Sequence, residues 1–157
     1  MKNKFYTALV FGIASIPWTY LFALFQIPLW PSFIASASFF ASGKKFFKSY
    51  LNNLIGIIYA ALTLLFARDI FRSSVLWLSI IVGIFMFIGS LHYMLKLLSF
   101  LPAVFLGYAT MFSINAAKAT IGGVSGIFGQ VLATATSMLI GSIIALMVHL
   151  AARRLSG

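Results

Sequence analysis

The chain has 157 residues, of which 62% are hydrophobic and 8% are charged, whereas soluble domains carry about 25% charged residues. Its mean hydropathy is +1.09, so a soluble fold is excluded because it could not hide this much apolar surface. The formal net charge is +10, but the basic residues lie at the ends of apolar blocks, which argues against a nucleic-acid partner. The composition predicts an all-α, polytopic membrane protein whose main partner is the lipid bilayer.

Six apolar segments, separated by basic or proline-containing breaks, are predicted to form the transmembrane helices. The first follows Lys2 and Lys4 and is too long for the apolar core of a signal peptide, which has about 7 to 15 residues. The run from Ile27 to Pro31 ends the first helix, because two prolines so close together cannot sit in a helix interior. The predicted helices cover about residues 6–26, 30–43, 50–67, 75–95, 100–115 and 131–152.

Two parts of this plan have alternatives. The second and fifth helices are short, so at about 1.5 Å per residue they either barely cross a bilayer or re-enter it from one side. The glycine-rich run from Gly122 to Gly129 is either a loop with a half-helix or the first turns of the last helix.

An internal duplication relates the two halves of the chain. Residues 33–41 and 105–113 both have Phe in the first position, Ala in the fifth and Phe in the eighth. Residues 54–68 align without gaps with residues 139–153, and eight of the fifteen positions are identical. The identities include a glycine and a terminal arginine, which apolar composition alone does not supply.

Each copy of the duplication holds three predicted helices, and an odd number of crossings turns the second copy upside down in the membrane. We therefore expect a single membrane domain, residues 1–157, made of repeat one, 1–72, and repeat two, 73–157. Both termini are expected in the cytoplasm, because eight basic residues then lie inside and three outside, as the positive-inside tendency requires. The outside residues are Arg68, Arg72 and Lys118, and the inside ones are Lys2, Lys4, Lys44, Lys45, Lys48, Lys96, Arg153 and Arg154.

Four phenylalanines are candidate pore-lining residues. Phe33 and Phe40 share one helix face, and Phe105 and Phe112 repeat that face in the second copy. Rings related in this way can form a hydrophobic constriction in a pore. Alternatively they face lipid or fill the core, which is the commoner place for phenylalanine in a membrane protein.

Asn52 and Asn53 are the other candidate pore-lining residues. An amide without partners in hydrocarbon costs several kcal/mol, as an order of magnitude. These side chains therefore either bind a neighbouring helix or line a wet path. Across the duplication they align with Ser137 and Met138, so a pore built from these positions is asymmetric.

Several chemistries lack the residues they need. No acidic residue lies inside an apolar block, which favours a neutral or anionic solute over a cation. There is no cysteine, and His92 and His149, expected at the membrane interface, make a poor metal site without acidic partners. No carboxylate pair, Ser-His-Asp set or phosphate-binding loop occurs, so we expect neither catalysis nor a cofactor.

The aromatic and small residues resemble a known family. Trp18 in the first helix is followed by Trp30 and by FFASG at 39–43, which lead into the asparagine-bearing third helix with Gly56. A Pro-x-x-Phe-x-Gly entry follows at 102–107. The combination resembles the small bacterial inner-membrane proteins of the domain of unknown function family 1097. This resemblance implies a compact helix bundle in the bacterial cytoplasmic membrane, and it brings no established activity or catalytic residues.

The sequence thus predicts a passive channel or facilitator for a small neutral or anionic solute, with its path between two inverted repeats. One alternative is a non-catalytic membrane subunit or assembly protein without transport activity. Another is an alternating-access carrier, for which paired short segments at matching places in the two halves are the expected sign. A homo-oligomer is also expected, because six short helices make a thin bundle with exposed small-residue faces.

Overall fold

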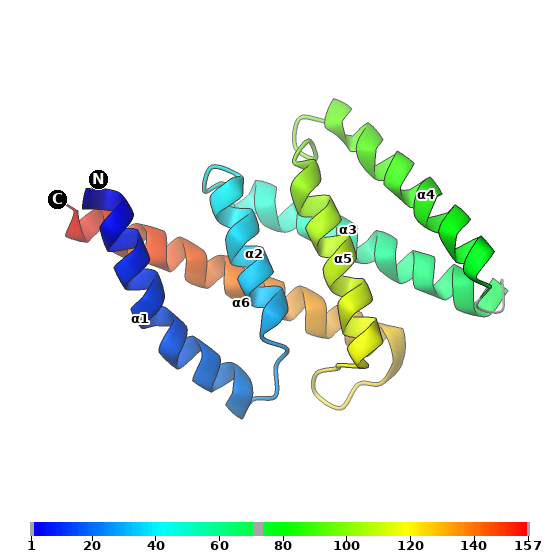
Figure 1. The fold of residues 1–157 in the computed structure, drawn as a ribbon, viewed down its shortest axis with the longest axis horizontal. Coiled ribbons are helices and arrows are strands. Elements are labelled where there is room, and N and C mark those ends of the chain that lie inside the picture. The colour runs from blue at the N-terminus through cyan, green and yellow to red at the C-terminus, as the bar shows by residue number, and fades with distance from the viewer. Residues whose placement is uncertain (1, 71–73, 157) are drawn as a thin grey trace.

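The computed structural model describes residues 2–70 and 74–156, and over these residues the chain forms six α-helices and no strand (Figure 1). The helices are α1 (Lys2–Leu24), α2 (Trp30–Ala41), α3 (Phe46–Leu65), α4 (Val75–Leu91), α5 (Leu101–Ala117) and α6 (Gly126–Leu155). A π-helical turn, η1 (Phe66–Ile70), extends α3, and a 3-10 turn, η2 (His92–Met94), follows α4. The predicted all-α class is confirmed.

The six helices lie where the sequence predicts them, but some of their ends are different. α3 begins at Phe46 instead of residue 50, directly after a turn in which Gly43 and Lys44 have φ values of 72° and 66°. α6 begins at Gly126 instead of residue 131. The turns of the backbone determine where these helices begin, whereas the predicted starts were based on hydropathy.

The glycine-rich run is a loop that leads into α6. Gly122 and Gly123 have φ values of 63° and 73°, in the left-handed region that glycine adopts without a steric penalty. Residues with this backbone conformation do not continue an α-helix. The segment up to Ser125 is therefore a loop, and the rest of the run forms the first turn of α6.

Three stretches are long and apolar enough to cross a membrane: Lys4–Leu24, Phe46–Ile70 and Gly126–Leu155. α4 and α5 have 17 residues each, and α2 has 12. A helix of 12 residues is about 18 Å long, which is shorter than the hydrocarbon core of about 30 Å. The predicted shortness of the second and fifth helices is therefore confirmed, whereas six full crossings are not established.

The short helices of each half pack on the long helix of the other half. α5 makes its main contact with α3, and α2 makes its main contact with α6. In Figure 1, α2 crosses α6 and α5 crosses α3, and α2 and α5 run in opposite directions. The core therefore lies along the seam where α3, α5, α6 and α2 meet.

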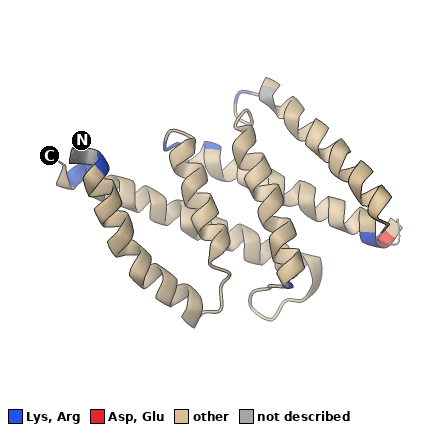
Figure 2. Cartoon of the chain, in the orientation of Figure 1, with Lys and Arg blue, Asp and Glu red and all other residues tan. Residues whose placement is uncertain are grey.

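Basic residues are gathered on one side of this helix layer. Figure 2 shows those at the termini, in the α2–α3 turn and in the α4–α5 linker along one edge, which we call the basic edge. The basic positions at the C-terminal ends of α3 and α5 lie away from this edge in Figure 2. Arg72 and the predicted boundary between repeats at 72–73 fall outside the described residues.

Candidate functional site

Glycines allow the two halves to approach backbone to backbone. A Cβ atom on Gly56 of α3 would overlap the carbonyl oxygen of Val104 in α5, and one on Gly141 of α6 would overlap that of Ser32 in α2. Gly56 and Gly141 align with one another in the predicted duplication, and Val104 and Ser32 immediately precede its other aligned segment. The same type of close contact thus occurs at equivalent places in both halves.

The predicted phenylalanines Phe33 and Phe40 both lie against α1. The ring centroid of Phe33 is 4.5 Å from that of Trp18, and the centroid of Phe40 is 6.1 Å from that of Phe11. Trp18 is buried, and its indole N–H donates a hydrogen bond to the Ser32 hydroxyl at 3.1 Å. These two rings therefore help to attach α1 to the rest of the bundle.

Their counterparts in the second half have different surroundings. Phe105 is 40% exposed. Phe112 is partly buried against the core and stacks on Tyr108, with the ring centroids 5.0 Å apart. The structure thus distributes the four predicted rings over separate surroundings, and their pore-lining role stays a prediction.

Asn53 belongs to a buried polar network near the basic edge. Its amide nitrogen donates to the Ser38 hydroxyl at 3.2 Å, and the Ser38 and Ser49 hydroxyls are 2.8 Å apart. All three side chains are fully buried. The Asn53 Oδ1 atom has no hydrogen-bond partner among the described residues, so the network retains an unused acceptor.

Asn52, the neighbouring residue, connects α3 to the α4–α5 linker. Its amide nitrogen donates to the carbonyl oxygens of Lys48 at 2.6 Å and Leu97 at 3.1 Å. Its Oδ1 atom is also buried without a partner in the described part of the chain. Both predicted asparagines therefore bind neighbouring segments through their nitrogens and leave their oxygens free.

An apolar cluster fills the middle of the seam. It consists of Ala35, Ile57, Ala60, Ala61, Tyr108, Met111 and Met138. The Tyr108 hydroxyl is satisfied by the Thr63 hydroxyl at 2.8 Å, so its polar end does not break the apolar barrier. Its α3 residues Ile57, Ala60 and Ala61 lie between Asn53 and the far end of α3.

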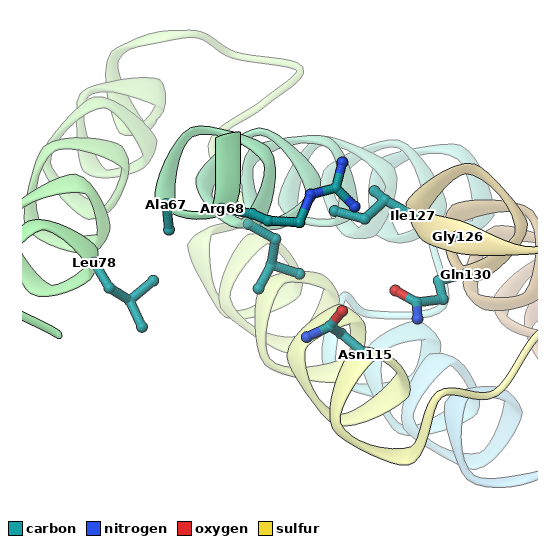
Figure 3. Close-up of a pocket in the computed structure, with 8 residues that line it drawn as sticks. Ala67, Arg68, Leu78, Asn115, Gly126, Ile127 and Gln130 are labelled. Atoms are coloured by element: carbon teal, nitrogen blue, oxygen red, sulfur yellow. The ribbon is translucent and has the colours of Figure 1, made fainter. Parts of the chain in front are cut away.

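A pocket of about 300 Å³ lies at that far end, between α3, α4, α5 and α6 (Figure 3). Its polar side chains are Arg68, Asn115 and Gln130, and its other lining residues are Leu64, Ala67, Leu78, Gly126 and Ile127. Figure 3 shows the Gln130 and Asn115 amides on one side of the pocket and the Arg68 guanidinium on the other. We call this the far pocket.

Gln130 is the polar group of the far pocket that most needs a ligand. Its side chain is only 7% exposed, and its Oε1 atom has no hydrogen-bond partner among the described residues. A buried acceptor left without a partner costs about 1 to 3 kcal/mol. The pocket therefore presents an acceptor that a bound donor would satisfy.

The positive groups around the far pocket have one acidic neighbour. The Arg68 side chain pairs with Asp69, with Nε to Oδ1 at 2.6 Å, and both side chains are more than half exposed. Lys118 lines an adjoining pocket that shares Asn115, Gly126 and Gln130 with the first. The region around the two pockets thus has two cations and one anion among its described residues.

The histidines are packed against aromatic residues. His92 Nε2 lies 2.9 Å from the Tyr59 hydroxyl, and the His149 ring centroid is 6.5 Å from that of Phe39. Within residues 2–70 and 74–156, no three His, Asp or Glu side chains are grouped so that they could hold a metal ion.

Gln130 and Asn115 are not among the six predicted site residues. One signal was available in the sequence, because Gln130 is an amide next to an apolar block, as Asn52 and Asn53 are. The role of Gln130 in the far pocket depends on lining residues of α3 and α5, which are far from it in the sequence.

The fold and the site define an all-helical protein whose long helices are apolar enough to cross a membrane, with a polar pocket at one end of the helix seam. The chain belongs to the family described as protein of unknown function DUF1097, whose model matches residues 8–153. This match covers nearly the whole chain and confirms the resemblance noted in the sequence. No curated protein and no solved structure matches the chain.

Proposed function

We propose that the protein is a membrane facilitator for a small neutral or anionic solute, whose path follows the seam between the two halves. The observation that carries this proposal is the pair of buried, unpartnered amide oxygens on Asn53 and Gln130. Asn53 lies near the middle of α3, and the far-pocket residue Arg68 lies about 22 Å further along, in the turn η1 that extends this helix. The apolar cluster between them supports a closed state, in which a solute enters from one end at a time.

Inverted three-helix repeats are part of this proposal. The equivalent glycine contacts at Gly56 and Gly141 support them. A second pair of equivalent positions agrees: Asn52 donates to the linker before α5, and Ser137 donates to the Pro28 carbonyl before α2 at 2.6 Å. Transporters built in this way place the substrate path between their repeats.

The charges favour a neutral or anionic solute. Asp69 is the single acidic residue of the chain and is paired with Arg68, so a cation finds no free carboxylate along the seam. The closed centre suits an alternating-access carrier as well as a channel. A subunit without transport activity is the remaining alternative, and flux measurements separate it from the other two.

Labelling a single cysteine in the seam tests the path, because the natural chain has no cysteine. Ser49→Cys is nearly isosteric and lies in the buried network. We expect a methanethiosulfonate reagent to react there during open excursions and to reduce solute flux into proteoliposomes at least tenfold, measured by stopped-flow light scattering with urea, glycerol, formate and lactate. The same reagent on Ser79→Cys, an exposed position of α4, should leave flux unchanged.

Two results would count against this proposal. Flux equal to that of empty liposomes for every solute would favour the subunit without transport activity. Flux that persists after complete labelling at position 49 would place the path outside the seam.

We further propose that the protein lies in the bacterial cytoplasmic membrane with the basic edge and both termini in the cytoplasm. A fluorescent protein fused after Gly157 should then fluoresce, and alkaline phosphatase fused there should be inactive. The same phosphatase inserted after Gly123, in the loop before α6, should be active. The reverse pattern would contradict this orientation.

A homo-oligomer is part of the proposed assembly. The chain exposes 9037 Å² of surface, whereas a compact monomer of its 17.2 kDa mass exposes about 7,800 Å². A thin helix layer gives this excess, and a second copy or lipid covers it.

A further inference from the structure

The far pocket has the features of a specific binding site for one chemical class of solute. Gln130 contributes the first feature, because it lines the pocket and its buried Oε1 acceptor has no partner among the described residues. A simple anion without an O–H or N–H group, such as chloride or formate, cannot donate a hydrogen bond to that atom. The ligand that suits the pocket therefore carries an O–H or N–H donor.

The second feature is a positive field. Arg68 lines the pocket and Lys118 lines the adjoining one, while Asp69 offsets only one of these charges. Gly126, the first residue of α6, lines both pockets, and Ser125 makes no side-chain cap there. The free N–H groups at the start of a 30-residue helix add partial positive charge. This field favours a carboxylate on the ligand.

The third feature is the size and lining of the pocket. Leu64, Ala67 and Ile127 form apolar walls in a volume of about 300 Å³, which is at the lower end of small-molecule sites. A short carbon chain fits between these walls, with its polar ends on Gln130 and Arg68. The Asn115 amide, which lies beside Gln130 in Figure 3, can hydrogen-bond either end.

We propose that the far pocket binds a small monocarboxylate that carries a hydroxyl or amino group. The carboxylate lies against Arg68 and the start of α6, and the hydroxyl or amino group donates to Gln130 Oε1. This inference rests on the proposed function in one respect, since it names the solute class that the facilitator takes up from this side. Binding itself is measurable without transport.

Three ligands of nearly equal size separate the two polar features. Lactate has both the charge and the hydroxyl donor, propionate lacks the hydroxyl, and lactamide lacks the charge. With the full chain in phosphatidylcholine nanodiscs, isothermal titration calorimetry should show lactate binding at least tenfold more tightly than either of the others. A site that hydrogen-bonds a ligand hydroxyl discriminates strongly against the analogue without it.

Two variants assign the features to residues. Gln130→Met keeps the side-chain length and should weaken lactate binding at least tenfold while leaving propionate binding unchanged. Arg68→Gln should weaken lactate and propionate but leave lactamide unchanged. Arg153→Gln removes an exposed arginine at the other end of α6 and should change none of the three.

Several outcomes overturn the proposal. One is equal affinity for the three ligands, and another is no binding of any of them. A third is an equal loss of all ligands in Gln130→Met, which would mark a purely structural residue. Lactate binding in nanodiscs without flux in liposomes would contradict the proposed facilitator but support the binding site. Flux without any preference for lactate would support the facilitator but contradict the binding site.

Discussion

Replacing Gly56 or Gly141 with alanine should lower the free energy of unfolding by about 2 to 4 kcal/mol, near the upper end of what overpacking costs. Each new methyl group would occupy the place of a backbone carbonyl oxygen in the facing helix, on Val104 or Ser32 respectively. A backbone atom cannot turn aside as a flexible side chain does, so α5 must separate from α3, or α2 from α6. Because these are the main contacts between the halves, the loss affects the whole bundle.

Unfolding of the purified variants in mixed detergent and SDS, followed by circular dichroism, measures this loss. Gly83→Ala is the matched control, because a Cβ atom there meets nothing within 4 Å. Because alanine favours a helix more than glycine does, its free energy of unfolding should equal that of the natural chain or exceed it by up to about 1 kcal/mol. Equal small effects at Gly56 and Gly83 would show that the halves do not approach as closely as described.

Replacing Asn52 with leucine should cost about 1 to 2 kcal/mol. Leucine fills a similar volume but cannot donate to the Leu97 carbonyl, which lies 45 residues away in the sequence. Interhelical hydrogen bonds in membranes average below 1 kcal/mol, and the remaining cost comes from leaving a carbonyl oxygen without its partner. Leucine also removes the buried Asn52 Oδ1 atom, which has no partner among the described residues, and this gain offsets part of the cost.

Ser99→Ala is the control for Asn52→Leu. It removes a second link between α3 and the same linker, the hydrogen bond from Lys48 Nζ to the Ser99 hydroxyl at 2.9 Å. Lys48 and Ser99 are only partly buried, so water replaces this bond and the cost should be a few tenths of a kcal/mol. A larger loss for Ser99→Ala than for Asn52→Leu would contradict the importance of the buried amide.

Much of the fold could be predicted because its signals are local. Pro28 lies between α1 and α2, and Pro31 lies in the first turn of α2, where the missing N–H of proline is tolerated. The shortness of α2 and α5 is likewise visible in the lengths of their apolar segments. The exact start of α6 was missed, because it depends on the left-handed backbone of Gly122 and Gly123, whereas hydropathy alone gave the predicted boundary.

The site could be predicted only in part. Asn52 and Asn53 were noticed because amides are rare and expensive in apolar segments, and both lie fully buried in the seam. The sequence could not say that their nitrogens are used and their oxygens are free. Phe33 and Phe105 share a sequence position in the duplication, but one lies against Trp18 and the other is 40% exposed.

By itself, the sequence determined the class of this protein: an all-helical, apolar chain with a duplicated pattern, in a family that its aromatic and small residues already indicated. Composition and helix breaks suffice for this, because both properties are local. The residues of a segment decide whether it prefers lipid or water and which backbone conformations it can adopt. Only the tertiary structure decided that Arg68, Asn115 and Gln130 line one pocket and that Gly56 meets Val104. These contacts join helices distant in the chain, and the packing of the whole seam determines them.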